Sequence, residues 1–147
     1  MKPIRLRLRS QRGTALLETA LTLPLLLLVS VGIVEFGRAY QTWQVLTNAA
    51  REGARLAVLP DSTPAAAAAR VAAYLQSGQL SNAAAAAVVV TTVPIDIGGG
   101  ATAPASQVTV NYPFQFIVLQ PVARLIVRGS TLGAPLTMTA SAVMRNE

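Results

Sequence analysis

The longest apolar run of the chain covers residues 15–34 and contains one charged residue, Glu18. At about 1.5 Å of rise per residue, a helix of this length spans about 30 Å, the thickness of a bilayer core. Pro24 lies inside the run, and a proline costs about 3 kcal/mol in a soluble helix, whereas membrane helices tolerate the kink. The pattern therefore predicts one membrane-spanning helix.

The helical pattern continues beyond the apolar run to about residue 59, and Pro60 is expected to end it. Small residues recur in this stretch at four-residue intervals, at Ala49, Gly53 and Ala57. Such a stripe lets another backbone approach closely. We therefore expect this face to pack on a partner helix or on the chain's own sheet, and the neighbouring charged residues 51, 52 and 55 to form a solvated face.

The rest of the sequence predicts a small domain that begins with a helix. Residues 61–64 are typical of a helix cap with Pro64 at the first helical position, and the helix is expected to run through residues 65–77 and stop at Gly78. Residues 81–87 are rich in alanine and compatible with helix or strand. The β-branched residues 88–93 predict a strand, and the glycines at 98–100 predict a flexible turn.

Alternation with a period of two predicts two further strands, in residues 107–116 and 136–145. In the first of these, Pro113 suggests an edge strand or a bulge. The side chains expected in the core are Val108, Val110, Tyr112, Phe114 and Phe116. Residues 116–129 predict a short amphipathic helix or a buried connection. The fold class is therefore α+β, with a long N-terminal helix, one or two further helices and about three antiparallel strands.

The net charge of +6 comes from the N-terminus, because five of the twelve cations lie in the first dozen residues. From Thr14 onward, seven arginines stand against six acids, and no basic stripe is interleaved with aromatic residues. We therefore expect no nucleic-acid partner. Cations before the apolar run, with only Arg38 soon after it, predict a cytoplasmic N-terminus. Glu35 and Arg38 can pair where the helix leaves the membrane.

Residue types that common active sites require are missing from the sequence. The chain has no cysteine and no histidine, and its one lysine is Lys2, which excludes disulfides, thiol nucleophiles and histidine triads. The acids outside the apolar segment are scattered, with no spacing that pairs them for acid–base catalysis. No Gly-Lys-Ser/Thr and no helix start follow the glycines at 98–100, which excludes a phosphate loop. We expect no enzymatic activity, metal, cofactor or small-molecule substrate.

Three interpretations of the N-terminus are open. A cleavable secretory signal has a basic and an apolar part, but no convincing A-x-A site follows this run, and the run is long for a signal. A signal anchor would stay uncleaved. The third interpretation uses Gly13, Thr14 and Glu18, because a short basic leader, a glycine and a glutamate at the fifth position after it resemble the processing site of type IV prepilins.

The prepilin resemblance implies that a dedicated membrane peptidase cuts between Gly13 and Thr14 on the cytoplasmic side. The new ammonium group at Thr14 would lie one helical turn from Glu18. A carboxylate near that amine, in its own chain or a neighbour's, has a counter-charge within the apolar layer and can set the register of packed helices. In the alternative, Glu18 lies at the headgroup level and stays hydrated.

More narrowly, the chain is similar to the TadE-like family, pseudopilins of the tight-adherence (Tad) system that assembles Flp pili. The resemblance is carried by "RGTALLETALTLPLLLL", "GIVEFGRAYQ", "NAAREGAR", "VTVNYPFQF" and "LTMTASAVMRNE", and TadF-like chains share it. It implies a minor, non-enzymatic subunit that a prepilin peptidase processes and that assembly of an adhesive pilus requires. The implied partners are this peptidase, other Tad pseudopilins or pilins, and inner-membrane lipids.

The expected organisation has four parts: a basic prepilin-type leader in residues 1–13, a transmembrane helix in residues 14–36, its extracytoplasmic continuation in residues 37–60, and a small α+β domain in residues 61–147. The protein would cross the bacterial inner membrane once, with its C-terminal domain outside, or accompany the pilus. The competing hypothesis is an uncleaved, signal-anchored envelope protein whose exported domain binds a ligand or adheres.

Overall fold

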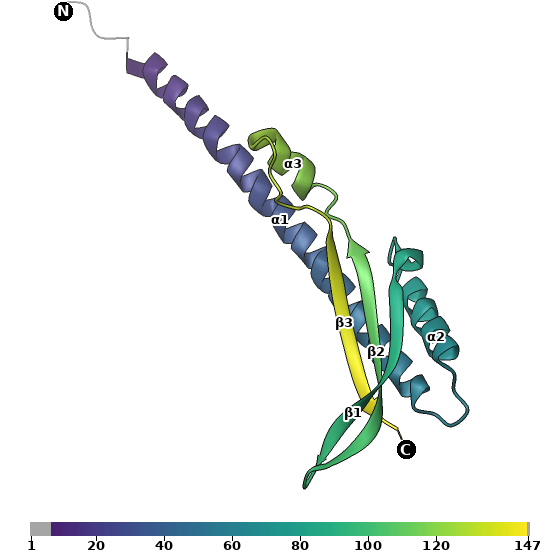
Figure 1. Cartoon of the computed structure of the whole chain (residues 1–147). Helices are drawn as coiled ribbons and strands as arrows, with labels where there is room; N and C mark the ends of the chain where they lie inside the picture. The colour runs from purple at the N-terminus through teal and green to yellow at the C-terminus, as the bar shows by residue number, and fades with distance from the viewer. Residues whose placement is uncertain (1–6, 147) are drawn as a thin grey trace, which may run out of the picture.

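The computed structural model describes the backbone of residues 7–146 and the side chains of residues 13–124 and 127–146. The first six residues of the expected leader lie outside the described part. Figure 1 shows a long helical rod, α1, with the other elements gathered along its C-terminal half. The element order, a long helix, a second helix and an antiparallel sheet with a third helix inserted before its last strand, confirms the predicted α+β class.

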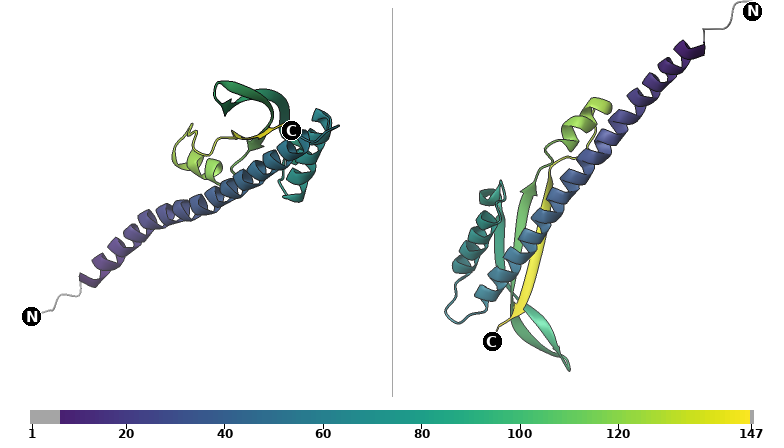
Figure 2. Two further views of the ribbon diagram at one scale, coloured as in Figure 1. Left: turned by 90° about the horizontal axis from the view of Figure 1, so that it is seen from below. Right: turned by 180° about the vertical axis from the view of Figure 1, so that it is seen from behind.

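The first element, α1, is one α-helix that covers Arg7–Ala57 and continues without a break through Pro24. It ends close to the predicted position, just before Pro60. Figure 2 shows that α1 bends gently along its length, as expected where a proline removes one backbone donor. The helix contains a segment that is long and apolar enough to cross a membrane. The predicted membrane-spanning segment and its continuation are thus a single rod.

The second helix, α2, covers Pro64–Ser77 and starts as its cap predicts. Thr63 is the N-cap, and its hydroxyl oxygen accepts a hydrogen bond from the backbone N–H of Ala66 at 3.2 Å. Pro64 occupies the first turn, where its missing N–H costs nothing, and the helix ends before Gly78. The ambiguous alanine-rich stretch that follows contains one short 3-10 helix, Ala83–Ala85.

The sheet has three antiparallel strands in the order β1-β2-β3, with β1 at Ala87–Gly98, β2 at Ala101–Phe114 and β3 at Leu136–Arg145. The glycines at 98–100 form the predicted turn between β1 and β2. Their φ angles of 93°, 65° and 78° explain why glycine is used there. Strand β1 extends to Gly98, beyond the predicted end at Val93, because it pairs with the extended start of β2.

Pro113 does not mark an edge strand, because β2 is the central strand of the sheet. The register explains why proline is tolerated there. The pairing of β1 with β2 ends with Ala87 opposite Asn111, whereas Pro113 still pairs with Thr137 of β3. At Pro113, β2 therefore has a neighbouring strand on one side only, which is the local condition of an edge.

One face of the sheet packs against the helices, with α1 over β2 and β3 and α2 over β1. The core between these two layers contains Ala39, Leu46, Ala49, Ala50, Ala54, Val71, Leu75, Val108, Val110, Tyr112, Phe114 and Ala140. The alternation that predicted an inward-facing row on β2 is confirmed, and Phe116 beyond the strand is half-buried. The domain therefore uses the C-terminal half of α1 as part of its own core.

Gly53 marks the closest approach of α1 to its neighbours. A Cβ atom added there would lie 2.5 Å from Val71 Cγ2 and 3.2 Å from Val108 Cγ1. Because valine side chains cannot bend away easily, we expect Gly53→Ala to lower the free energy of unfolding by about 1–3 kcal/mol. Urea unfolding of the full chain in detergent, followed by circular dichroism, measures this change.

The matched control is Gly37→Ala, on the same helix. A Cβ atom there meets nothing within 4 Å. Alanine is the better helix former, so this variant is expected to be about 0.5–1 kcal/mol more stable than the parent chain. If both variants unfold at the same urea concentration, the side chains of Val71 and Val108 move aside for the added methyl group at position 53 at little cost.

Candidate functional site

The two predicted processing residues lie on the exposed surface of α1. Gly13 and Thr14 are both exposed within the uninterrupted helix. A Cβ atom added to Gly13 would meet nothing within 4 Å. No contact of the described residues therefore requires a glycine at this position.

Glu18 lies one turn further along, exposed on the apolar part of α1. The neighbouring hydroxyl groups are satisfied within the helix: Thr19 donates to the carbonyl oxygen of Ala15, and Thr22 donates to that of Glu18, both at 2.9 Å. Among the described residues, nothing forms a hydrogen bond or ion pair with the Glu18 carboxylate. This carboxylate is therefore available to a group outside the chain.

The structure separates the remaining predicted residues along α1. Pro24 is exposed in the apolar segment, whereas Ala49 and Gly53 are buried in the domain and Ala57 is half-buried beside them. The stripe of small residues contacts α2 and β2 of the same chain. Of the two partners considered for this stripe, the chain's own domain is the one that the structure shows.

A polar centre that the sequence revealed only in part lies at the end of the apolar segment. Glu35 is 2 % exposed. Its Oε2 atom accepts a hydrogen bond from Arg38 Nη1 at 2.7 Å, which confirms the predicted pair. Its Oε1 atom accepts from the backbone N–H groups of Ile117 at 2.9 Å and Val118 at 2.7 Å. Both carboxylate oxygens are therefore bonded.

Aromatic side chains surround this centre. The ring of Phe116 meets Phe36 edge to face with centroids 6.1 Å apart, and meets Phe114 in the same manner at 5.1 Å. The guanidinium carbon of Arg38 lies 5.6 Å from the centroid of Phe114. Contacts of this kind stabilise beyond the area they bury. Together with Glu35 they fasten the end of β2 to α1.

The backbone donors of this centre lie 82 and 83 residues from Glu35 in the sequence. They precede α3, which covers Leu119–Ile126. No local sequence pattern predicts that pairing. Ile117 and Val118 are two apolar residues in a connection, and any residue type there would offer the same backbone N–H groups. The sequence therefore predicted the ion pair and missed its role in fixing the domain to the helix.

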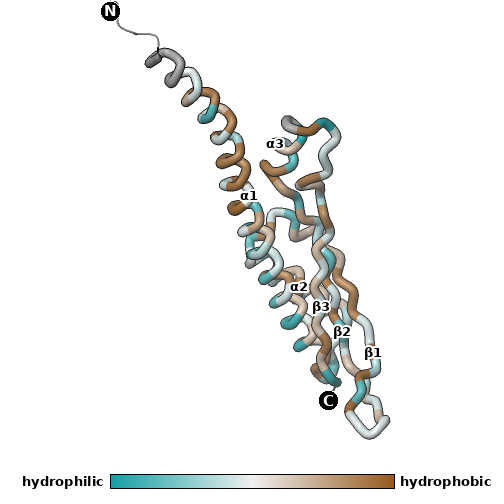
Figure 3. The backbone as a smooth tube through the Cα atoms, turned by 90° about the vertical axis from the view of Figure 1, so that its left-hand side faces the viewer, coloured by the Kyte–Doolittle hydropathy of each residue, from teal (hydrophilic) through white to brown (hydrophobic). Residues whose placement is uncertain are grey.

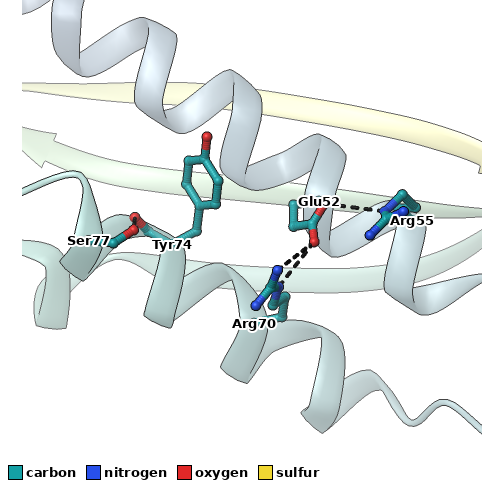
Figure 4. A network of polar contacts seen from close by, with 5 residues as sticks. All are labelled: Glu52, Arg55, Arg70, Tyr74 and Ser77. Atoms are coloured by element: carbon teal, nitrogen blue, oxygen red, sulfur yellow. Dashed lines mark hydrogen bonds and ion pairs between the residues drawn. The ribbon is translucent and has the colours of Figure 1, made fainter.

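A second ionic cluster links α1 to α2 near the far end of the domain, as Figure 4 shows. Arg70 donates to Glu52 Oε1 at 2.8 Å and 3.1 Å, and Arg55 Nε lies 3.3 Å from Glu52 Oε2. The hydrogen bond from Arg70, helped by Arg55, holds the pKa of Glu52 below its ordinary value. An acid held in its ionised form between two arginines serves as a structural link rather than as a proton donor.

A groove of about 390 Å³ opens beside Arg38, between α1, the connection after α2 and the end of β2. Its lining is mostly uncharged and includes the glutamines 41, 79 and 115 and Tyr112, and among the described residues Arg38 is the one charged member. A lining of this kind offers no pair of groups for acid–base catalysis.

The chain is thus a long helix whose exposed apolar first half is able, by length and composition, to span a membrane, and whose second half carries a small α+β domain. Over residues 13–55 the chain matches the family described as TadE-like protein. The resemblance predicted from the sequence is thereby confirmed for this segment, which is less than a third of the chain. No curated protein and no solved structure matches the chain.

The matched segment coincides with α1 and excludes the sheet. It starts at Gly13 and includes Glu18, Glu35 and Gly53. The family signal is therefore a property of the helical rod, from the predicted processing position to its packing against the domain.

Proposed function

We propose that the protein is a minor pseudopilin-like subunit required for assembly of a Tad/Flp-type pilus. A prepilin peptidase removes residues 1–13 at the cytoplasmic face of the inner membrane. The mature chain then crosses that membrane once, with the α+β domain outside, and joins other Tad pseudopilins or pilins through α1.

One observation carries this proposal: the family match begins at Gly13, and Glu18 is the one acid of the exposed apolar segment that follows. Among the described residues no packing contact requires a glycine at position 13, which fits a residue read by another protein. The carboxylate of Glu18 lies on the helix surface, where a neighbouring subunit can reach it.

The proposed mechanism is lateral association of helices. Little hydrophobic force drives helices together in lipid, so close packing and charge pairing must supply the association. The domain-proximal stripe around Gly53 is occupied by the chain's own domain, which leaves the apolar half of α1 as the surface for other subunits. Glu18, paired with the new ammonium group of Thr14 in its own or an adjacent chain, sets the register.

Processing is tested by the mass of the N-terminal peptide of the membrane-extracted protein. With a co-expressed prepilin peptidase the chain is expected to start at Thr14, and without it at Met1. Gly13→Ala is expected to abolish the cleavage, because the added methyl group occupies the position at which the peptidase requires a glycine.

Gly37→Ala is the control for this experiment, since neither glycine has an atom within 4 Å of an added Cβ. It is expected to be cut like the parent chain. A chain that keeps Met1 in the presence of an active peptidase contradicts the proposal and supports the uncleaved envelope protein. A chain that starts beyond Gly37 indicates a secreted domain without a membrane helix.

A further inference from the structure

The surface around α3 exposes large apolar side chains. These are Ile117, Val118, Val127, Leu132 and Leu136, from the two connections that flank α3 and from the start of β3. They come from one continuous stretch of about 20 residues, and we call the exposed side chains of residues 117–136 the α3 surface. Exposed apolar patches of this kind mark contact with another molecule or with a membrane.

The α3 surface lies at the level where α1 is apolar. The hydrogen bonds from Ile117 and Val118 to Glu35 fix the start of α3 at the end of the apolar segment. From there α3 lies beside the apolar part of α1, on the side toward the N-terminus, as Figures 1 and 3 show. Residues 28, 31 and 32 are half-buried within this otherwise exposed segment.

The same stretch carries two exposed cations, Arg124 and Arg128. Among the described residues, neither has a carboxylate partner, whereas Arg38, Arg55 and Arg70 all do. Arg124 lies on α3 and Arg128 in the connection after it, next to the exposed apolar residues of the two flanking connections. Exposed apolar side chains with arginines close by suit a membrane surface, where arginine meets anionic headgroups.

We propose that the α3 surface is a second membrane contact, which dips into the outer boundary of the bilayer that α1 crosses. The occupant is lipid, with acyl chains against the apolar residues and anionic headgroups against Arg124 and Arg128. This inference rests on the proposed membrane position of α1. Because Ile117 and Val118 are bonded to Glu35 at the end of the apolar segment of α1, lipids that surround α1 reach the α3 surface without any rearrangement of the domain.

The contact gives the domain a fixed orientation. A single membrane helix leaves the domain free to rotate about the helix axis. With α1 and the α3 surface both in contact with the membrane, this rotation is prevented. The bonds of Glu35 connect the two attachments.

The test uses the full chain with single cysteines, which is practical because the sequence contains none. Val127→Cys is labelled with an environment-sensitive fluorophore in vesicles of phosphatidylcholine and phosphatidylglycerol, and quenched by spin-labelled lipids. Val89→Cys on β1 is the matched control, since the two valines are 59 % and 47 % exposed. Leu25→Cys, at a site 61 % exposed on α1, reports whether the helix lies in the bilayer.

Spin-labelled lipid is expected to remove most of the fluorescence at positions 127 and 25 and to leave position 89 unchanged. Quenching at 25 without quenching at 127 overturns this inference and leaves the proposed function intact. Absence of quenching at 25 overturns the membrane position itself. A blue-shifted but unquenched label at 127 means that protein covers the α3 surface, which overturns the assignment to lipid.

Headgroup charge is tested in vesicles of phosphatidylcholine alone, where quenching at position 127 is expected to weaken. The double variant Arg124→Gln, Arg128→Gln is expected to weaken it likewise in the mixed vesicles. Equal quenching in both kinds of vesicle overturns the role assigned to the two arginines.

Discussion

Replacing Glu35 by alanine is expected to destabilise the attachment of the domain to α1 by about 3 kcal/mol. The substitution removes the acceptor for Arg38 and for the backbone N–H groups of Ile117 and Val118. These hydrogen bonds are part-buried, so the donors that lose a charged acceptor regain only part of their hydration. Hydrogen exchange measured by mass spectrometry should show faster exchange of the amides at 117 and 118, and urea unfolding should shift to lower concentration.

Two variants separate the causes of this loss. Glu35→Gln keeps an oxygen that can accept from the two amides but loses the charge that pairs with Arg38, so an intermediate loss is expected. Glu52→Gln is the matched control on the same helix, because Glu52 pairs with the exposed Arg55 and Arg70 among the described residues and a small effect is expected. If Glu35→Ala unfolds like Glu52→Gln, the Glu35 contacts do not hold the domain.

The parts of the fold that local chemistry determines were predictable from the sequence. Thr63 and Pro64 predict the start of α2, because a hydroxyl residue at the N-cap followed by a proline is typical of the first turn of a helix. The glycines at 98–100 predict the hairpin, because glycine adopts the positive φ angles that a tight turn needs, and all three do so here. The alternation of β2 likewise identified its buried row, since one strand face packs on the helices.

The features that depend on long-range pairing were not predictable in the same way. Pro113 suggested an edge because its chemistry is local. The strand order that makes β2 central, and the end of the β1–β2 pairing before Pro113, both depend on long-range contacts. The stripe at Gly53 required a close neighbour without revealing that Val71 and Val108 supply it. For the candidate site, the ion pair of Glu35 was visible at a spacing of three residues, and its backbone partners were not.

Glu18, inside the apolar segment of α1, and Glu35, at its end, have opposite surroundings. Glu35 is buried and fully bonded within the chain, so it serves the fold. Glu18 is exposed and has no partner among the described residues, so any role of its charge involves a group that arises on processing or belongs to another molecule. A membrane helix that keeps a charge without an internal partner does so at a cost in insertion, which favours a function in assembly.

Glu18→Gln is therefore expected to abolish pilus assembly while leaving the chain processed and in the membrane. Glutamine has nearly the same shape and is less costly in lipid, but it cannot pair as an anion with the ammonium group of Thr14. The measurement compares the amount of sheared pili with the amount of mature chain in membranes, in cells that produce only the variant. Cleavage is followed in the same samples, so that a defect in processing is not mistaken for one in assembly.

Thr19→Val is the control for this prediction. It changes the adjacent polar residue, whose hydroxyl already donates to the carbonyl oxygen of Ala15, and it is expected to assemble pili normally. Normal assembly by Glu18→Gln would mean that the carboxylate is hydrated at the headgroup level and has no part in pairing helices. Loss of assembly by both variants would attribute the effect to the general polarity of this turn. Loss of pilus assembly by Glu18→Gln alone means that assembly requires the charge of Glu18. This is the result expected if processed helices associate laterally.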